Sequence, residues 1–346
     1  MAKRTTIYDI ANRLGLSTAT VNRALSGKPR ISEETRALIL RTAEEMNYRP
    51  NSLAHSLARR TLRIAIVCLT SFPEFHSCFL DGVRDAALEL ADYNIHVDYF
   101  VYNDGATNTP QADSYLTESL RRISEEGYDG VLALARPDDG FRLLRKKGVC
   151  VGAAVNDIGP EDRDFCIAHD GFAAGRVAAE LIYHWMLDRE RPVAIASGNQ
   201  EITIHINTVQ GFRSQLTRTP LNLKSVYYNY DNEDIAFHET EALLRSCPDL
   251  GAIYVNSFNS RGVIRAVQAS GRNGIVLVTS DICRALAEDI EAGTVAASIF
   301  QNQYEQGRRG LHALYQRLNG HTAEAESIVI SPQIILSGNL SIYFPG

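Results

Sequence analysis

The sequence of 346 residues lacks the features that mark secreted and membrane-spanning proteins. It has no run of about eighteen apolar residues, so no transmembrane helix is expected. Residues 1–4 are followed by an amphipathic segment rather than by the apolar core of a signal peptide. The six cysteines are scattered without a CxxC pair, which argues against a disulfide framework. We therefore expect a cytoplasmic protein that does not associate with a membrane.

Signals for catalysis and for metal binding are also missing. The sequence contains no GxGxxG, Walker A or GxSxG motif, and its nine histidines show neither HExxH nor HxxxH spacing. Acidic pairs such as Asp138 and Asp139 fall in predicted loops, where carboxylates are ordinarily solvated. We therefore expect no enzymatic activity, no metal and no cofactor.

Residues 6–25 predict two short helices joined by a tight turn. The segment from Thr6 to Leu14 repeats apolar residues at helical spacing. Gly15 permits a sharp turn, and Ser17 can cap a second helix. Two short helices joined by a glycine-containing turn are the helix-turn-helix pattern, whose second helix enters the major groove of DNA.

The borders of these helices carry capping signals. Thr6 and Asp9 form a predicted capping pair at the start of the first helix. A third helix is predicted after Ser32, with acidic residues in its first turn, and it ends before Pro50. The pattern therefore predicts a three-helix unit.

Basic residues are concentrated in the same part of the chain. Residues 1–60 hold eleven lysines and arginines against five acidic residues, a net charge of +6. The whole chain has 35 basic and 41 acidic residues, so the remainder carries 24 against 36, a net charge of −12. A basic segment on an acidic body is the pattern expected when one part of a protein binds the DNA phosphate backbone. Solubility alone is the weaker explanation, because the basic segment contains the helix-turn-helix pattern.

Four segments of this region identify a family resemblance. TVNRALSG (20–27), ISEET (31–35), YRPN (48–51) and LAHSL (53–57) resemble the LacI (lactose repressor) family of bacterial transcription regulators. The match is most specific over 5–66, and the rest of the chain matches by pattern. The resemblance implies a repressor that binds a pseudo-palindromic double-stranded DNA operator as a homodimer and responds to a small-molecule effector.

The resemblance also implies DNA contacts. The candidate residues are Thr6, Ser17, Thr18, Ala19, Thr20, Asn22, Arg23, Asn51 and Leu57. Thr18, Ala19 and Arg23 are expected to face the bases, with Arg23 pairing with guanine. For Asn22, a phosphate contact and adenine readout both remain open. Residues 51–61 are expected to form a hinge helix only on DNA, with Leu57 as a wedge in the minor groove.

The remainder, 62–346, alternates apolar strand-like runs with helical stretches. Strands are predicted at 64–69, 95–101, 130–135, 149–155, 193–197, 225–230, 253–256, 275–279 and 296–300. Helices are predicted at 81–90, 114–126, 141–146, 172–187 and 207–216. This order predicts an α/β body of two lobes with parallel sheets, like periplasmic sugar-binding proteins, preceded by an all-α headpiece (1–50) and the hinge. Small ligands bind such bodies in a cleft at the carboxyl ends of the strands.

Candidate effector-binding residues follow from the resemblance and from strand ends. They are Phe72, Phe75, Arg136, Asn156, Asp157, His205, Thr208, Asn256, Asp281 and Gln301. Phe72 or Phe75 could stack on a sugar ring, or one of them could fill the lobe core. Asp281 and Gln301 are the strongest candidates, because a carboxylate at a strand end in an apolar cleft needs a donor. Their alternative role is a capped loop or a hinge hydrogen bond.

The effector is expected to be a neutral sugar or polyol. Thr208 stands where the family often has an arginine, and the loss of that bidentate donor disfavours an anionic effector. Arg136 could replace it from the other lobe. The alternative function, a solute-binding protein of a sugar transporter, would require an export signal and no basic headpiece.

Overall fold

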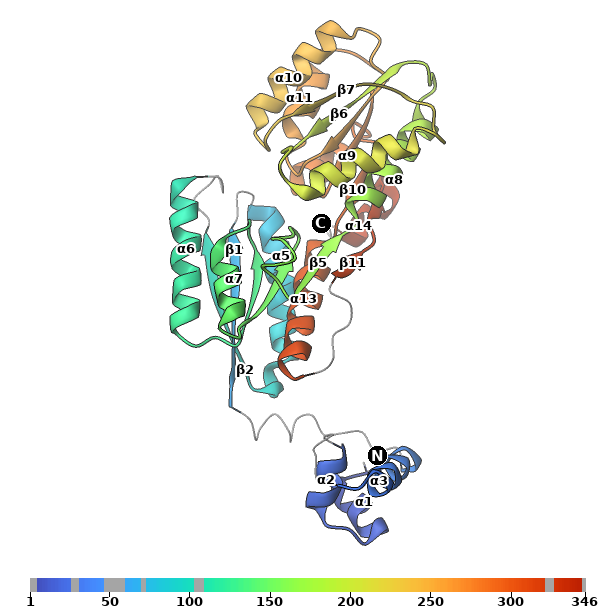
Figure 1. The fold of residues 1–346 in the computed structure, drawn as a ribbon. Helices are drawn as coiled ribbons and strands as arrows, with labels where there is room; N and C mark the ends of the chain where they lie inside the picture. Colours follow the sequence, from blue (N-terminus) through green and yellow to red (C-terminus); the bar gives the residue numbers. More distant parts are fainter. Residues whose placement is uncertain are drawn as a thin grey trace. The chain divides into compact units, whose positions relative to one another are not determined.

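The computed structural model describes residues 5–25, 31–46, 60–69, 73–102, 109–320 and 327–343. The chain divides into two compact units. One is Met1–Thr61 with Leu90–Asn94, and the other is Leu62–Glu89 with Ile95–Gly346. The first unit contains the headpiece helices, and the second is the α/β body (Figure 1).

The described headpiece helices are α1 (Ile7–Leu14), α2 (Thr18–Leu25) and α3 (Glu33–Glu45). Their buried apolar side chains form one small core: Ile10, Ala11, Val21, Ala24, Ile39 and Ala43. Gly15 ends α1 with a φ of 65°, a left-handed conformation that glycine adopts without strain. The predicted helix-turn-helix is therefore confirmed. The 3₁₀ helix η1 (Ala91–Tyr93) is grouped with the same unit.

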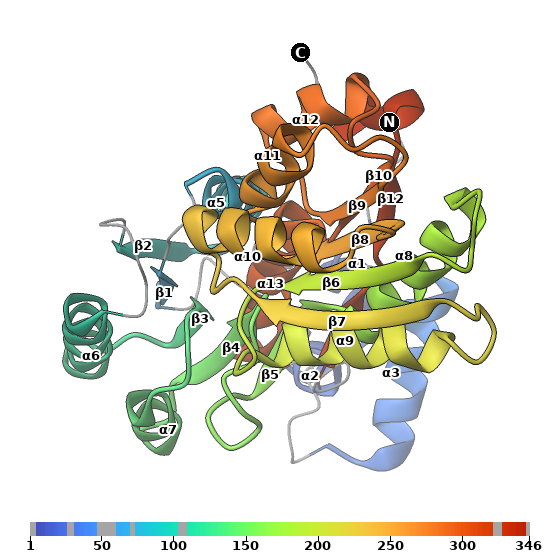
Figure 2. The same cartoon turned by 90° about the horizontal axis from the view of Figure 1, so that it is seen from above.

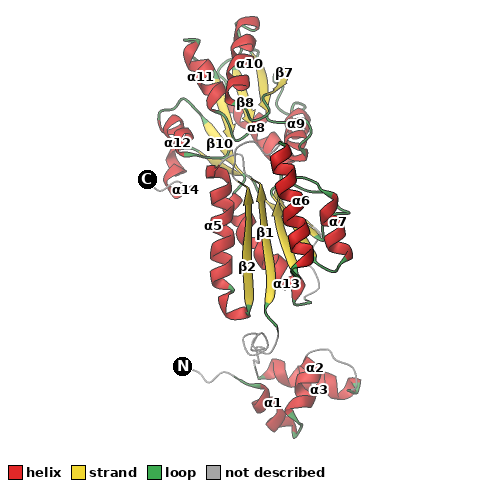
Figure 3. Cartoon of the chain, turned by 90° about the vertical axis from the view of Figure 1, so that its left-hand side faces the viewer, coloured by secondary structure: helices red, strands yellow, loops and turns green. Residues whose placement is uncertain are grey.

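The first lobe of the body is a sheet of parallel strands between two layers of helices (Figure 3). Its strand order is β11-β5-β4-β3-β1-β2. The strands are β1 (Leu62–Leu69), β2 (Ile95–Tyr102), β3 (Gly130–Leu134), β4 (Cys150–Ala154), β5 (Phe165–His169) and β11 (Ser327–Ile330). One face is covered by α5 (Pro73–Glu89) and α13 (Gln303–Leu318), and the other by α6 (Pro110–Glu125) and α7 (Asp139–Lys146). Both faces of the sheet are thus buried, which explains why its central strands are continuously apolar.

The second lobe repeats this architecture with the strand order β12-β10-β9-β8-β6-β7. Its strands are β6 (Pro192–Ser197), β7 (Asn222–Tyr228), β8 (Ala252–Asn256), β9 (Val276–Ser280), β10 (Ala297–Phe300) and β12 (Gln333–Ile335). One face packs on α8 (Gly171–Trp185) and α9 (Thr203–Gln215), and the other on α10 (Glu233–Ser246), α11 (Arg261–Ala269) and α12 (Arg284–Glu291) (Figure 2). The 3₁₀ helix η2 (Ser337–Asn339) and α14 (Leu340–Tyr343) follow β12.

The structure differs from the sequence prediction in how the chain is distributed between the lobes. The chain passes to the second lobe after β5, returns after β10 to form α13 and β11, and passes back to form β12. The predicted two-lobed body is confirmed, but these three crossings between the lobes were not predicted. β12 also runs antiparallel to β10, so the second sheet is not wholly parallel. Strands β5, β11 and β12 and helices α10 to α14 were not predicted, and α5 begins at Pro73 instead of near residue 81.

Glycines let neighbouring helices approach closely in both lobes. A Cβ atom at Gly82 of α5 would collide with the carbonyl oxygen of Tyr304 on α13. A Cβ at Gly211 of α9 would collide in the same way with the carbonyl oxygen of Phe172 on α8. Each contact brings one helix backbone directly against the other, and only glycine leaves room for it.

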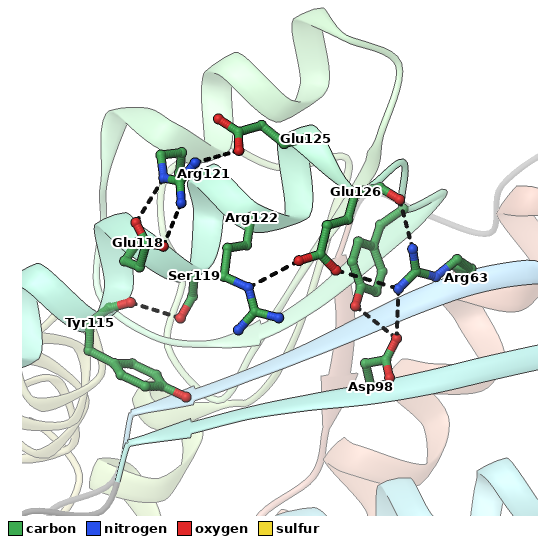
Figure 4. A network of polar contacts seen from close by, with 10 residues as sticks. Arg63, Asp98, Tyr115, Glu118, Ser119, Arg121, Arg122, Glu125 and Glu126 are labelled. Carbon is green, nitrogen blue, oxygen red and sulfur yellow. Dashed lines mark hydrogen bonds and ion pairs between the residues drawn. The ribbon is translucent and has the colours of Figure 1, made fainter.

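A polar network fixes the outer edge of the first lobe (Figure 4). The guanidinium of Arg63 on β1 donates to the carboxylate of Asp98 on β2 at 3.2 Å and to the carbonyl oxygen of Glu126 at 2.7 Å. The Tyr128 hydroxyl donates to Asp98 at 2.8 Å, and the Arg63 guanidinium lies 4.2 Å from the centre of the Tyr128 ring. Exposed ion pairs contribute little stability, so this network mainly positions β1 and β2.

The two faces of α7 allow a matched test of the first-lobe core. Phe141 is fully buried, whereas Leu143 on the same helix is 57% exposed. Phe141→Ala should lower the free energy of unfolding by about 3–5 kcal/mol, because it removes buried apolar surface and leaves a cavity. Leu143→Ala should change it by less than about 0.5 kcal/mol. Urea unfolding followed by circular dichroism measures both values, and equal losses in the two variants would contradict this core.

Candidate functional site

Helix α2 presents one buried and one exposed face. Its N-terminus is capped by the Ser17 hydroxyl, which accepts a hydrogen bond from the N–H of Thr20 at 3.1 Å. Val21 and Ala24 are buried in the headpiece core. Ala19, Asn22 and Arg23 are exposed and Thr18 is half-buried, as a helix that reads the major groove requires.

Three of the predicted DNA-binding side chains have structural roles within the headpiece. Thr6 accepts a hydrogen bond from the N–H of Asp9 at 3.3 Å, and the Asp9 carboxylate accepts one from the Thr6 N–H at 2.8 Å, so the predicted capping pair is confirmed. The hydroxyls of Ser17 and Thr20 lie 2.8 Å apart in a hydrogen bond. These bonds set where α1 and α2 begin. Asn51 and Leu57 lie outside the described residues.

The body contains a cavity of about 570 Å³ where the strands of both sheets end. Leu69, Leu134 and His169 line it from the ends of β1, β3 and β5. Asn256 and Ser280 line it from the ends of β8 and β9 in the other lobe. Parallel sheets bind small ligands at this edge, and the volume is that of a small-molecule site. Of the predicted effector-binding residues, seven line this cavity: Phe75, Asn156, His205, Thr208, Asn256, Asp281 and Gln301.

Asp281 is held by two glutamines at the crossover from β10 to α13. Its carboxylate accepts hydrogen bonds from the side-chain amides of Gln301 at 2.7 Å and Gln303 at 2.8 Å. The Ser298 hydroxyl donates to the Asp281 carbonyl oxygen. Asp281 is 2% exposed, and burial raises the pKa of its carboxyl to about 6 despite the glutamine donors. The structure thus gives Asp281 and Gln301 the hinge hydrogen bond that was the alternative to direct ligand binding, while both still reach the cavity wall.

His205 and Asn256 belong to a second network at the cavity wall. The Asn256 amide accepts a hydrogen bond from the Gly198 N–H at 3.3 Å and donates to the His205 carbonyl oxygen at 3.3 Å. The His205 ring packs directly on Gly198, where a Cβ would collide with it. Thr208 donates its hydroxyl to the carbonyl oxygen of Ile204 at 2.8 Å, so it does not replace the missing arginine as a free donor.

Aromatic side chains from both lobes meet at the cavity. Phe75 lies in the first turn of α5, and its ring contacts Phe258 of the second lobe edge-on, with the ring centres 5.4 Å apart. Phe75 therefore reaches the cavity instead of filling the first-lobe core. Phe72 lies outside the described residues.

Two predicted effector-binding residues do not line the cavity. Arg136 pairs with Asp113, so the expectation that it supplies the missing cation is not met. Asp157 accepts hydrogen bonds from Arg163 at 2.6 Å and from the Gly159 N–H at 2.9 Å, which satisfies its carboxylate within its own loop. Both side chains have local partners that the strand pattern did not reveal.

Several cavity residues were missed by the sequence analysis. Asn199, Asp231 and Phe258 each follow a second-lobe strand, and His169 ends β5. Asp231 could have been found, because it comes directly after the predicted strand 225–230. His169 could not, because β5 itself was not predicted.

The described part of the cavity wall is acidic. Asp231 and Asp281 line it, and no lysine or arginine is among the described residues that do so. Burial lowers the pKa of His169 to about 4 and also lowers that of His205, so both imidazoles are neutral at neutral pH. The arrangement suits a ligand that offers hydrogen-bond donors and carries no negative charge.

The described residues offer little to redox or metal chemistry. The six cysteines are unpaired, and burial raises the pKa of the Cys68, Cys150 and Cys166 thiols to about 12. Over the described ranges, no group of three or more His, Cys, Asp or Glu side chains is placed to hold a metal ion. Among the helices that the structure describes, none is long and apolar enough to cross a membrane.

Known families match both units. The profile of the bacterial regulatory proteins of the lacI family matches residues 6–51, and that of the periplasmic binding protein domain matches 64–322. Catabolite control protein A of Priestia megaterium is 25% identical over 349 residues, covering 95% of this chain and 97% of that protein. The ribose operon repressor of Escherichia coli is 22% identical over 344 residues, covering 96% and 99%.

Solved structures agree on the fold of the body. The glucose-galactose binding protein GanP of Geobacillus stearothermophilus superposes with a TM-score of 0.71 at 17% identity, covering 82% of this chain and 99% of that one. A periplasmic ribose transporter protein of Conexibacter woesei gives a TM-score of 0.73 at 17% identity, covering 83% and 96%.

A helix-turn-helix headpiece joined to a two-lobed body of this fold defines a class of DNA-binding regulator. The chain belongs to the lacI family within that class, and it is a sequence-specific transcriptional regulator. Its relatives are regulators rather than enzymes.

The buried Asp281 carboxyl predicts a pH dependence of stability. An aspartate in the unfolded chain ionises near pH 3.9, whereas the folded pKa is about 6, so the folded state binds more protons between these values. This group therefore makes the free energy of unfolding fall as pH rises from about 4 to 6, by at most about 1.4 kcal/mol per pH unit. Asp281→Asn should remove that contribution in thermal unfolding from pH 4 to 7.

The difference in pH-dependent stability between Asp281→Asn and the wild type separates the contribution of Asp281 from that of His169. The depressed pKa of His169 makes stability rise with pH over an overlapping range, and it is present in both proteins. Asp157→Asn is the control, because Arg163 and the Gly159 N–H hold the Asp157 pKa below its usual range despite burial. That group therefore titrates at lower pH, and its removal should leave the slope above about pH 5 unchanged. An unchanged slope in Asp281→Asn would contradict the proposed titration.

Proposed function

We propose that this regulator is a cytoplasmic repressor whose affinity for its operator is controlled by a small neutral sugar or polyol. The observation that carries the proposal is a cavity with acidic, amide and aromatic walls and no lysine or arginine among its described lining residues, in a chain that also has a helix-turn-helix. Hydroxyl-bearing ligands satisfy such walls, whereas a sugar phosphate would leave its charge unpaired. The protein acts through binding alone, without catalysis.

Relatives support the effector class and the role as a repressor. One relative is named a ribose operon repressor, and similar solved structures include a solute-binding protein from Bacillus halodurans with bound myo-inositol. A role as the solute-binding protein of a transporter is disfavoured, because that role does not require the DNA-binding α1–α3 headpiece.

The protein acts as a homodimer on a pseudo-palindromic operator. One headpiece reads a single half-site, and two headpieces related by a two-fold axis read two half-sites spaced by about one helical turn of DNA. The effector lowers operator affinity in this scheme, so the genes are repressed in its absence.

Arg23 tests the recognition helix. It is exposed on α2, where its guanidinium can pair with guanine in the major groove. Arg23→Ala should cost about 1–3 kcal/mol of binding free energy and relax the preference at one base position. Selection of binding sites from random DNA measures this. Arg41→Ala removes the same charge from the exposed surface of α3 and should leave the preference unchanged; a preference retained in Arg23→Ala would rule out this role.

The control by effector predicts reciprocal coupling. If an effector weakens operator binding by some factor, operator must weaken effector binding by the same factor. Calorimetry with D-ribose, D-galactose, D-glucose and myo-inositol, with and without operator, measures both quantities and the number of chains per operator. The Arg23→Ala protein is the control at an operator concentration that saturates the wild type but, after a loss of about 1–3 kcal/mol, leaves the variant mostly unbound. Its effector affinity should then be the same with and without operator. An effector affinity that ignores operator in the wild type would refute control by effector.

A further inference from the structure

Asp231 lines the cavity, and its carboxylate receives no hydrogen bond from the other described residues. It follows β7 and lines the cavity beside Tyr230. Its N–H donates to the side-chain oxygen of Asn229 at 3.0 Å, and its carbonyl oxygen accepts from the Asn259 amide at 3.3 Å. Its backbone groups are therefore bonded, while its side chain is left for whatever enters the cavity.

The loop that carries Asp231 is built to hold this side chain in place. Tyr230 and Asp231 both have left-handed backbones, with φ of 52° and 56°. The Tyr230 N–H donates to the Gly198 carbonyl oxygen at 2.7 Å, and the buried Asn229 amide donates to the Ser257 hydroxyl at 3.3 Å. Non-glycine residues keep such a backbone only where the surroundings enforce it, and this occurs most often at binding sites.

His205 supplies a donor next to this acceptor. The shorter of two contacts at its Nδ1 is with the N–H of Asn199, at 2.8 Å, so Nδ1 accepts and the neutral ring carries its proton on Nε2. No other described residue bonds Nε2. Burial raises the pKa of Asp231 and lowers that of His205, and each side chain partly offsets the shift of the other, so the two lie close together.

Asp281, the other acid of the cavity, is in a different situation. Both of its oxygens already receive amide donors from Gln301 and Gln303. Of the two carboxylates among the described lining residues, Asp231 is the one that receives no side-chain donor, and no lysine or arginine of that lining competes for it. An acceptor beside a donor matches two neighbouring hydroxyl groups, of which one donates and the other accepts.

We propose that Asp231 and His205 are the specificity-determining pair of the effector site, binding a vicinal diol through the Asp231 carboxylate and the His205 Nε2–H. The inference rests on the proposed function, since it assumes a hydroxyl-bearing effector. The same carboxylate rejects anionic forms of that effector, because an acid group on the ligand would meet Asp231 without a cation to neutralise it.

The experiment compares matched probes by calorimetry on the full chain. The neutral probes are D-glucose, D-galactose, D-ribose and myo-inositol, and the matched acids are D-glucuronate and D-galacturonate. We expect at least one neutral probe to bind, both acids to bind at least about 10-fold more weakly than their parent sugars, and a deoxy analogue lacking the contacted hydroxyl to lose about 10-fold.

Two variants and one control test the residues. Asparagine adopts the left-handed backbone readily, so Asp231→Asn should leave this loop unchanged. The variant should bind the neutral probe about 10-fold more weakly, and the ratio between its affinities for the neutral sugar and the matched acid should become smaller. His205→Gln should lower the affinity for the neutral probe and leave the ratio of neutral-sugar to acid affinity unchanged. Glu239→Gln removes the same charge at the exposed surface of α10 and should change neither value.

The possible results separate this inference from the function on which it rests. Acids that bind as tightly as their parent sugars, or neutral binding unaffected by Asp231→Asn, overturn the role of Asp231 and leave a sugar-responsive regulator intact. A wild-type protein that binds none of the neutral probes overturns the effector class and this inference together. Unchanged operator binding without effector shows that each variant is folded.

Discussion

The constraint on which the body depends is the burial of the Asp281 carboxylate at the point where the chain leaves one lobe for the other. Gln301 follows β10 in the second lobe, and Gln303 is the first residue of α13 in the first lobe. A carboxylate with 2% exposure is costly unless donors surround it, and these two amides provide them. The crossover therefore cannot change its course without leaving a buried charge unsatisfied. The same hydrogen bonds fix one corner of the cavity.

Much of the fold could be predicted from the sequence because local signals determine it. Ser17 and Gly15 set the headpiece turn, and continuous apolar runs identified the central strands of both sheets. β5 was missed because this strand is only five residues long and is followed directly by Asp170, the N-cap of α8. α13 was missed for a different reason: Gly307 packs against the Phe79 backbone of α5, and that contact has no counterpart in local propensity.

The site was predicted in part for the same reason. Strand ends can be read from a sequence, so Asn256 and Asp281 could be placed at the cavity before the structure was known. What a side chain binds depends on residues that are distant in sequence. Arg136, in the loop after β3, was a reasonable source of positive charge until Asp113 on α6 proved to be its partner. Because Arg136 pairs with Asp113 and does not line the cavity, the Asp231 carboxylate has no lysine or arginine beside it among the described lining residues, which strengthens the case against an anionic effector.

The lobes already contact each other across the cavity, which bears on how an effector can act. Glu74 of α5 accepts a hydrogen bond from the Arg284 N–H at the start of α12 at 3.1 Å, and Phe75 meets Phe258 beside it. Cys283 gives α12 no side-chain cap of its own, so Glu74 supplies from the first lobe the acceptor that this helix end needs.

A ligand shifts an equilibrium between closed and open lobe arrangements only by the difference between its affinities for the two arrangements. An effector that bonds one lobe alone, with the same affinity in both arrangements, would leave the lobe positions unchanged. Asp231 and His205 belong to the second lobe and Asn156 to the first. A polyol long enough to bond residues of both lobes can therefore favour one lobe arrangement over the other.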